Sequence, residues 1–212
     1  MDRLKDDGHL MYSPKFEHAA CGMGFITQVD GHPSHEIVEK ALTMLQRMNH
    51  RGGTGAEPDT GDGAGILMAL PDAFFRKQMA DYELTLPASG DYAVAQLFLP
   101  HDVEEKESML KAVTDQIDEA GFPVLWTRNV PFVYENCGPA AQQSMPGFVQ
   151  VILQRPVDIK AGQDFEDHLY ILRRQLEKTF DRESMYICSL SSRTIVYKGC
   201  LLYTSPSPRD TR

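Results

Sequence analysis

The sequence predicts an α+β fold, because segments with the pattern of strands come in neighbouring pairs and amphipathic helices separate the pairs. Short runs rich in apolar and β-branched residues, such as 147–154 "GFVQVILQ", are typical of buried strands. Apolar residues at helical spacing, as in 165–180, are typical of helices with one buried side. With 212 residues, 42% of them hydrophobic, the chain is long enough to bury a sizeable core.

The first two predicted elements are a strand and a helix. Residues 21–29, "CGMGFITQV", predict a strand that begins at Cys21 and ends at the turn residues "DGHP". Ser34 is a suitable N-cap for the following helix, in which apolar residues recur at helical spacing until "HRGG" ends the pattern.

A glycine-rich acidic loop over 54–65 separates this helix from the next strand. Residues 66–71, "ILMALP", predict a buried strand, and residues 72–79 predict a short helix. We interpret the segment 59–65 as a solvated turn set by its glycines rather than as a substrate-binding loop.

The remaining chain predicts further strands and two longer helices. The strands are expected at 92–100, 122–126, 147–154, 185–190 and 193–199, and the helices at 103–120, with Leu110, Val113 and Ile117 on its buried side, and around 165–180. From Leu201 onward "LLYTSPSPRDTR" shows no periodicity, and we expect residues 201–212 to be a non-native tail.

Charge and composition exclude several classes of function. The 21 basic and 30 acidic residues sum to −9, which argues against binding to nucleic acid or to an anionic membrane. No apolar run approaches the roughly 18 residues needed to span a bilayer, and residues 1–20 lack the apolar centre of a signal peptide. The expected location is therefore the cytoplasm. The four cysteines lie far apart with no C-x-x-C spacing, so we expect no metal site.

Cys21 stands at the first position of a predicted strand rather than inside an apolar run. If the chain were cut after Ala20, the thiol and a new α-amino group, whose reference pKa is near 8, would lie on one residue and could serve as nucleophile and base. The small residues before Cys21 suit such a cleavage, and Gly22 leaves room for a substrate. The alternative is a small buried thiol at the end of a strand.

Four segments in order, "EHAACGMGFI", "MNHRGG", "DTGDGAGILMALP" and "YICSLSSRTIVYKG", resemble the glutamine amidotransferase domain at the start of the glutamate synthase large subunit. The resemblance covers roughly residues 9–199. It implies a four-layer αββα fold of the N-terminal-nucleophile hydrolase type, C-terminally truncated in this chain. It also implies a leader, 1–20, that is removed on maturation, and an incomplete type 2 amidotransferase domain over 21–200.

The same resemblance implies a glutaminase reaction at Cys21. The thiol would attack the side-chain amide of L-glutamine to form a thioester, release ammonia, and yield glutamate on hydrolysis. Gly22, Arg51 and Gly52 would shape the pocket, with Arg51 close to the nucleophile. Arg51 could equally serve only to cap the C-terminus of its helix.

The chain departs from the family pattern in two places. Ala19 stands where an aspartate is common, and the family's carboxylate-binding arginine and oxyanion-hole Asn-Gly segments, expected after "YKG", are not in this sequence. The chain alone is therefore expected to be inactive or nearly so.

The resemblance also implies cofactors and partners for the parent enzyme. FMN and an iron–sulfur cluster are expected there and no cofactor in this region. The expected partners are L-glutamine, the remaining synthase domains and a small NADPH-oxidising subunit. Two alternatives stay open, namely another type 2 amidotransferase and a non-enzymatic globular domain with a buried cysteine.

Overall fold

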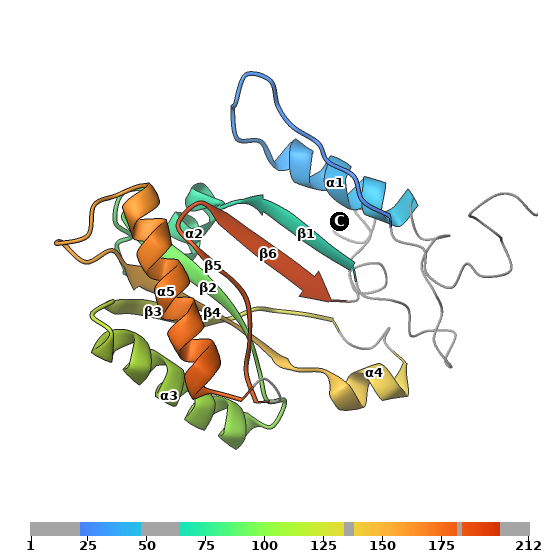
Figure 1. The fold of residues 1–212 in the computed structure, drawn as a ribbon. Helices are drawn as coiled ribbons and strands as arrows, with labels where there is room; N and C mark the ends of the chain where they lie inside the picture. Colours follow the sequence, from blue (N-terminus) through green and yellow to red (C-terminus); the bar gives the residue numbers. More distant parts are fainter. Residues whose placement is uncertain (1–21, 48–63, 134–137, 182–183, 200–212) are drawn as a thin grey trace, which may run out of the picture.

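The computed structural model describes residues 22–47, 64–133, 138–181 and 184–199 (Figure 1). These residues form a mixture of helices and strands, as the sequence predicts. In chain order the elements are α1 (His35–Arg47), β1 (Ala64–Ala69), α2 (Asp72–Ala80), β2 (Tyr92–Leu99), α3 (Val103–Glu119), β3 (Val124–Asn129), α4 (Pro139–Ser144), β4 (Gly147–Gln154), α5 (Gln163–Thr179), β5 (Tyr186–Ser191) and β6 (Thr194–Gly199).

The strands form two antiparallel sheets. The larger sheet has the order β3-β4-β2-β5, so its central pair is β2 and β4, with Tyr92 opposite Gln154 and Leu99 opposite Gly147. The smaller sheet pairs β1 with β6, with Ala64 opposite Gly199. The hairpin from β5 to β6 therefore connects the two sheets.

One face of the larger sheet packs against helices α3 and α5. Alternate residues of β2, from Ala93 to Leu99, enter this core because successive side chains of a strand point to opposite faces. The helices contribute apolar residues at helical spacing, which are Val113 and Ile117 from α3 and Phe165, Leu169, Leu172 and Leu176 from α5. Leu110 packs at the border of this core and is only partly buried.

The other face of the larger sheet forms a second, smaller core. Val94 and Ile152 pack there with Phe75 and Met79 of α2 and with Ile195 of β6. The β1–β6 sheet therefore lies on the side of the larger sheet opposite α3 and α5.

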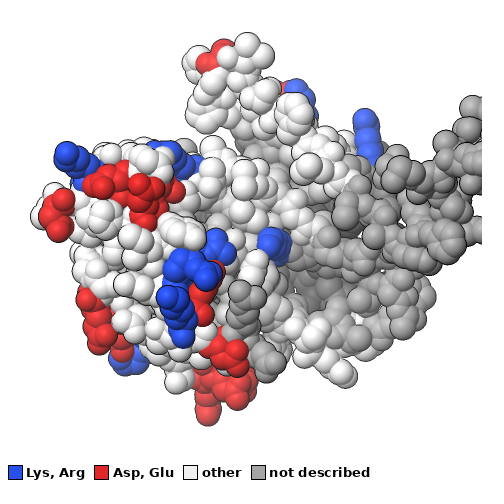
Figure 2. All heavy atoms as spheres, viewed as in Figure 1, with Lys and Arg blue, Asp and Glu red and all other residues white. Residues whose placement is uncertain are grey.

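Polar side chains cap the N-termini of helices α1 and α3. The Ser34 hydroxyl accepts a hydrogen bond from the Glu36 amide at 3.2 Å, which confirms the N-cap predicted for α1. Asp102 caps α3 by accepting from the amides of Glu104 and Glu105 at 2.9 and 3.0 Å. The exposed side of α3 carries many acidic residues, which lie along the lower part of Figure 2.

One prediction made from local pattern is wrong, and one helix was not predicted. Residues 22–28, within the predicted strand 21–29, have no strand structure, because no described strand lies alongside to supply hydrogen bonds. The short helix α4, which begins at Pro139, was not predicted from the sequence. A proline is tolerated at the first helical position, so it starts this helix rather than ending one.

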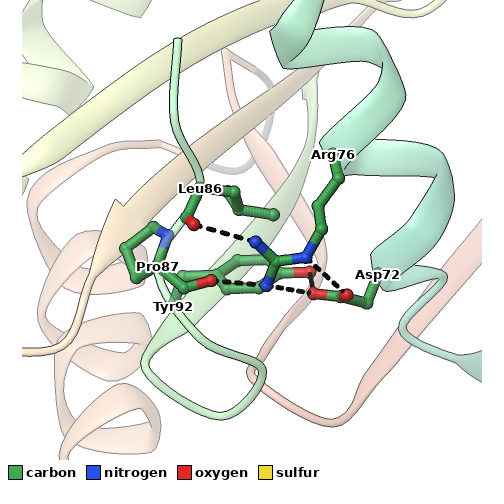
Figure 3. A network of polar contacts seen from close by, with 5 residues as sticks. All are labelled: Asp72, Arg76, Leu86, Pro87 and Tyr92. Atoms are coloured by element: carbon green, nitrogen blue, oxygen red, sulfur yellow. Dashed lines mark hydrogen bonds and ion pairs between the residues drawn. The ribbon is translucent and has the colours of Figure 1, made fainter.

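A polar network fixes α2 to the start of β2 (Figure 3). The Arg76 guanidinium pairs with Asp72, through Nε at 2.8 Å and Nη2 at 3.0 Å, and donates to the carbonyls of Leu86 and Pro87 at 2.9 and 2.6 Å. Tyr92 is fully buried and its hydroxyl donates to Asp72 at 3.0 Å. Burial, reinforced by this hydrogen bond, raises the pKa of Tyr92.

We expect Tyr92→Phe to lower the free energy of unfolding by about 1–2 kcal/mol, since it removes one hydrogen bond to a charged group and leaves the Asp72–Arg76 pair intact. Urea denaturation of the chain measures this. The control is Tyr170→Phe, at a tyrosine that is 64% exposed, and it should change stability little. Equal effects of the two substitutions would contradict the role given to the Tyr92 hydroxyl.

Candidate functional site

The structure describes one of the four predicted site residues. Gly22 is described and exposed, whereas Cys21, Arg51 and Gly52 lie outside the described residues. Their roles therefore stay predictions, and the structure shows only the described elements that adjoin them in the sequence.

Helix α1 contacts the segment that follows Cys21. Residues 22–34 run back along this helix in Figure 1. At Gly24 the approach is close, because a Cβ added there would lie 2.4 Å from Sδ of Met44. The helix itself ends at Arg47, four residues before Arg51 in the sequence. One helix thus adjoins both the segment after the predicted nucleophile and the segment that leads to the predicted arginine.

Strand β1 begins within the glycine-rich loop, at Ala64. Gly65 lies opposite Lys198 of β6, and a Cβ added at Gly65 would lie 3.0 Å from the carbonyl oxygen of Tyr197. Little room is left for a side chain, so this glycine permits the close pairing of β1 and β6. The end of the "GDGAG" segment, Ala64 and Gly65, therefore lies in strand β1 and not in the solvated turn expected over 59–65, while residues 59–63 lie outside the described residues.

A buried polar network joins the two sheets. Gln150 donates through Nε2 to Oε1 of Gln96 at 2.9 Å and to the hydroxyl of Tyr197 at 3.0 Å. Arg128 donates to Oε1 of Gln150 at 3.1 Å and to Oε1 of Gln78 at 3.3 Å. Burial raises the pKa of Tyr197. The network connects β2, β3, β4 and β6 with α2, and its amides are matched with partners as buried polar groups require.

This network was not predicted from the sequence, although two glutamines within apolar strands indicate it. Gln96 and Gln150 interrupt otherwise apolar strands, and such a glutamine needs a buried partner. The partners could not be named from the sequence, because Gln150 lies 54 residues from Gln96 and 47 from Tyr197.

The "SLSSRT" motif forms the anchored turn between β5 and β6. Glu166 of α5 accepts hydrogen bonds from the Ser191 hydroxyl at 2.9 Å and from the Ser192 amide and hydroxyl at 2.7 and 2.6 Å. Arg193 donates to Gln163 at 3.2 Å, and its carbonyl accepts from the Leu70 amide at 2.8 Å. These contacts give the motif a structural role.

Cys188 is a buried thiol on β5. Its Sγ donates to the carbonyl of Val196 at 3.3 Å, and burial raises the pKa of the thiol above its usual value. A raised pKa keeps this thiol protonated at neutral pH and burial keeps it from solvent, so Cys188 has the properties of a structural cysteine.

The described residues do not fit an iron–sulfur cluster. Such clusters are bound by several cysteine thiolates, and Cys188 is the only cysteine in the described part of the chain. The same residues contain no group of three His, Cys, Asp or Glu side chains arranged to hold a metal ion. Among them, no helix has the length and apolar character required to cross a membrane.

Comparison with known proteins places the predicted nucleophile at the start of a family match. The model of the class-II glutamine amidotransferases matches residues 21–206. The chain is 42% identical over 193 residues to the glutamate synthase [NADPH] large chain of Bacillus subtilis. The aligned residues cover 90% of this chain and 13% of that protein. It is 38% identical over 197 residues to glutamate synthase [NADH] of Schizosaccharomyces pombe, again 90% of this chain and 9% of that protein.

Ferredoxin-dependent relatives match to a similar degree. The chloroplastic ferredoxin-dependent glutamate synthase of Spinacia oleracea is 36% identical over 189 residues, which cover 87% of this chain and 12% of that protein. The chain therefore spans about one eighth or less of the length of these relatives.

We expect the Cys188 thiol to resist alkylation in the native chain at pH 8, because it is buried and its pKa is raised. Iodoacetamide treatment followed by peptide mass spectrometry tests this, with the same chain in urea as the control. Modification of Cys188 at the same rate with and without urea would contradict the burial seen in the structure.

Proposed function

We infer the function from one premise, that the chain belongs to the class-II glutamine amidotransferases. We propose that it is the glutaminase part of a glutamate synthase, which the identities of 36–42% to glutamate synthases support. The observation that carries the proposal is that the family match begins at Cys21, the residue whose thiol the sequence singles out.

The proposed nucleophile is Cys21 with a free α-amino group, exposed by removal of residues 1–20. The amine, with a reference pKa near 8, takes the thiol proton while sulfur attacks the side-chain carbonyl carbon of glutamine. The C–N bond then breaks, the nitrogen leaves as ammonia with a proton returned by the amine, and a γ-glutamyl thioester remains. Water cleaves the thioester to give glutamate and restores the thiol.

Three neighbouring residues are proposed to shape the pocket. Gly22 and Gly52 leave space for the substrate backbone, since neither carries a side chain. Arg51 holds a permanent positive charge that favours the thiolate and the anionic tetrahedral intermediate. The contact between Gly24 and Met44 supports this placement, because it brings the segment after Cys21 onto the helix that precedes Arg51.

We propose the four-layer αββα arrangement of N-terminal-nucleophile hydrolases for the domain. Two observations support it. The β1–β6 sheet lies on the face of the larger sheet opposite α3 and α5. Helix α1, on the side of the β1–β6 sheet, carries a stripe of half-buried apolar residues.

In the parent enzyme the released ammonia is proposed to react with 2-oxoglutarate in a separate domain. We propose that the FMN and the iron–sulfur cluster expected for that reaction lie in other parts of the parent chain. For the cluster, this is supported by the single cysteine among the described residues. A small NADPH-oxidising subunit is a proposed partner. The cytoplasmic location stays a prediction, because the names of some relatives are those of chloroplastic proteins.

The test of the nucleophile is Cys21→Ala in the complete parent enzyme. We expect it to abolish glutamine-dependent glutamate synthesis while synthesis from added ammonia survives, because free ammonia bypasses the hydrolysis step. Cys188→Ala is the matched control and should retain both activities, since Cys188 is buried away from solvent. Retained use of glutamine by the Cys21→Ala enzyme would overturn the assignment.

A further inference from the structure

The outer side of α5 carries two large apolar residues between charges of opposite sign. The helix packs on the larger sheet through Phe165, Leu169, Leu172 and Leu176. Since each residue of an α-helix advances by about 100°, a second set of residues falls within about one third of a turn on the opposite side. All of this set are exposed, and in chain order they are Asp164, Asp167, Tyr170, Ile171, Arg174 and Lys178.

The middle of this outer face is apolar. Tyr170 and Ile171 are 64% and 52% exposed. Single exposed apolar side chains are ordinary, but two adjacent ones at the centre of a helix face form a small patch. In Figure 1 α5 lies in front of the larger sheet, and Figure 2, which has the same view, shows white atoms over the middle of α5 between red and blue ones.

The two ends of the outer face carry opposite charge. The first half holds the two aspartates, and the second half holds Arg174 and Lys178. Arg174 shares Glu177 with Arg173, so two guanidinium groups meet one carboxylate and the second half keeps a net positive charge. The helix dipole by itself favours this order of charge. It does not account for the two apolar residues exposed between the charges, so the face as a whole indicates a partner.

We propose that the outer face of α5 is a contact between two copies of the chain, paired antiparallel about a two-fold axis that passes between Tyr170 and Ile171. Asp167 stands three residues before Tyr170, and Arg174 stands three residues after Ile171. An antiparallel pair centred here therefore places each Asp167 opposite Arg174 of the other copy. The two apolar patches cover each other at the centre.

A second copy fits this face because the face is complementary to itself. In a contact with two-fold symmetry the same patch is used on both copies, so each pair of opposite charges occurs twice. Asp164 and Lys178, six residues before Tyr170 and seven after Ile171, add a further pair at each end. A uniformly acidic or basic partner would instead meet like charges in one half of the face.

The contact lies away from the proposed glutaminase side of the domain. Helix α5 covers one face of the larger sheet, whereas the β1–β6 sheet, with α1 beside β1, lies on the other. Pairing through α5 therefore leaves α1 uncovered, and the inference does not depend on the proposed function. A pair of 17-residue helices forms a contact about 25 Å long, smaller than a standard interface, so we expect a weak and reversible dimer.

Cysteine cross-linking of the complete parent enzyme tests the geometry. In the antiparallel pair the two copies of position 170 stand close to the axis, whereas the two copies of position 178 lie about 22 Å apart along the helices. We expect Tyr170→Cys to be cross-linked by a short bis-maleimide, and Lys178→Cys, on the same face, not to be. Mass spectrometry identifies the product as a peptide pair that carries position 170 twice, which only two chains can supply.

Three results of this experiment would overturn the proposal. A cysteine at position 170 that reacts with N-ethylmaleimide but gives no cross-link would show an open face. One that reacts with neither reagent would lie under another part of the same chain. Equal cross-linking at positions 170 and 178 would rule out the antiparallel arrangement.

Exchange of two charges tests the pairing separately. Asp167→Arg or Arg174→Asp alone places like charges opposite each other at two symmetry-related points. Each should raise the dissociation constant of the parent dimer, measured by sedimentation equilibrium, about tenfold. The double variant restores both pairs and should return the constant to within about threefold of the unsubstituted value.

Asp115→Arg on α3 is the matched control for the charge exchange. Its side chain is 55% exposed, and the substitution should leave the dissociation constant unchanged. A double variant that dissociates as readily as the single variants would contradict the proposed contact. A parent enzyme without reversible self-association would contradict it as well.

Discussion

Both faces of the β2–β4 ladder are buried, and this burial fixes where the other elements can lie. On one face the small residues Ala93 and Ala95 let α3 and α5 approach closely, and larger residues fill the space beside them. On the other face Val94 and Ile152 pack against α2 and Ile195 of β6. A ladder covered on both sides must also satisfy its polar side chains internally.

Gln96 and Gln150 meet that requirement by bonding to each other and, through Gln150, to Arg128 and Tyr197. Loss of such a partner leaves a buried amide unsatisfied, at a cost of about 1–3 kcal/mol. The network therefore favours one position of β6 over the larger sheet. Because β1 pairs with β6, the same contacts also fix the position of β1, the strand that follows the glycine-rich loop.

Sequence patterns predicted the elements whose burial is visible in the local sequence. The helix over Phe165 to Leu176 shows it as apolar residues at helical spacing, and the strands around Val94 and Ile152 show it as nearly continuous apolar runs. The strand expected at 21–29 failed because a strand exists only with a partner, which the local pattern cannot supply. Tertiary contacts, such as those of Gln150, were beyond prediction because they join distant positions. The prediction that Cys21 is the nucleophile, which the structure does not test, rests on a local motif.

The motifs that carry the family resemblance divide into structural and chemical parts. Gly65 permits the pairing of β1 with β6, and Ser191 and Ser192 are anchored by Glu166. Cys188 is a buried thiol with a raised pKa. These assignments concentrate the proposed chemistry on Cys21 and on Arg51, which the sequence places just after α1.

The central claim, that a mature Cys21 performs glutaminase chemistry, is tested most directly by covalent labelling of the complete parent enzyme. The reagent is a glutamine analogue that carries a diazoketone in place of the side-chain amide, and peptide mass spectrometry locates the adduct. The account predicts one adduct per chain, on a peptide that begins at Cys21, and protection by excess glutamine. Labelling of another cysteine, or of a Cys21 that still follows Ala20, would contradict it.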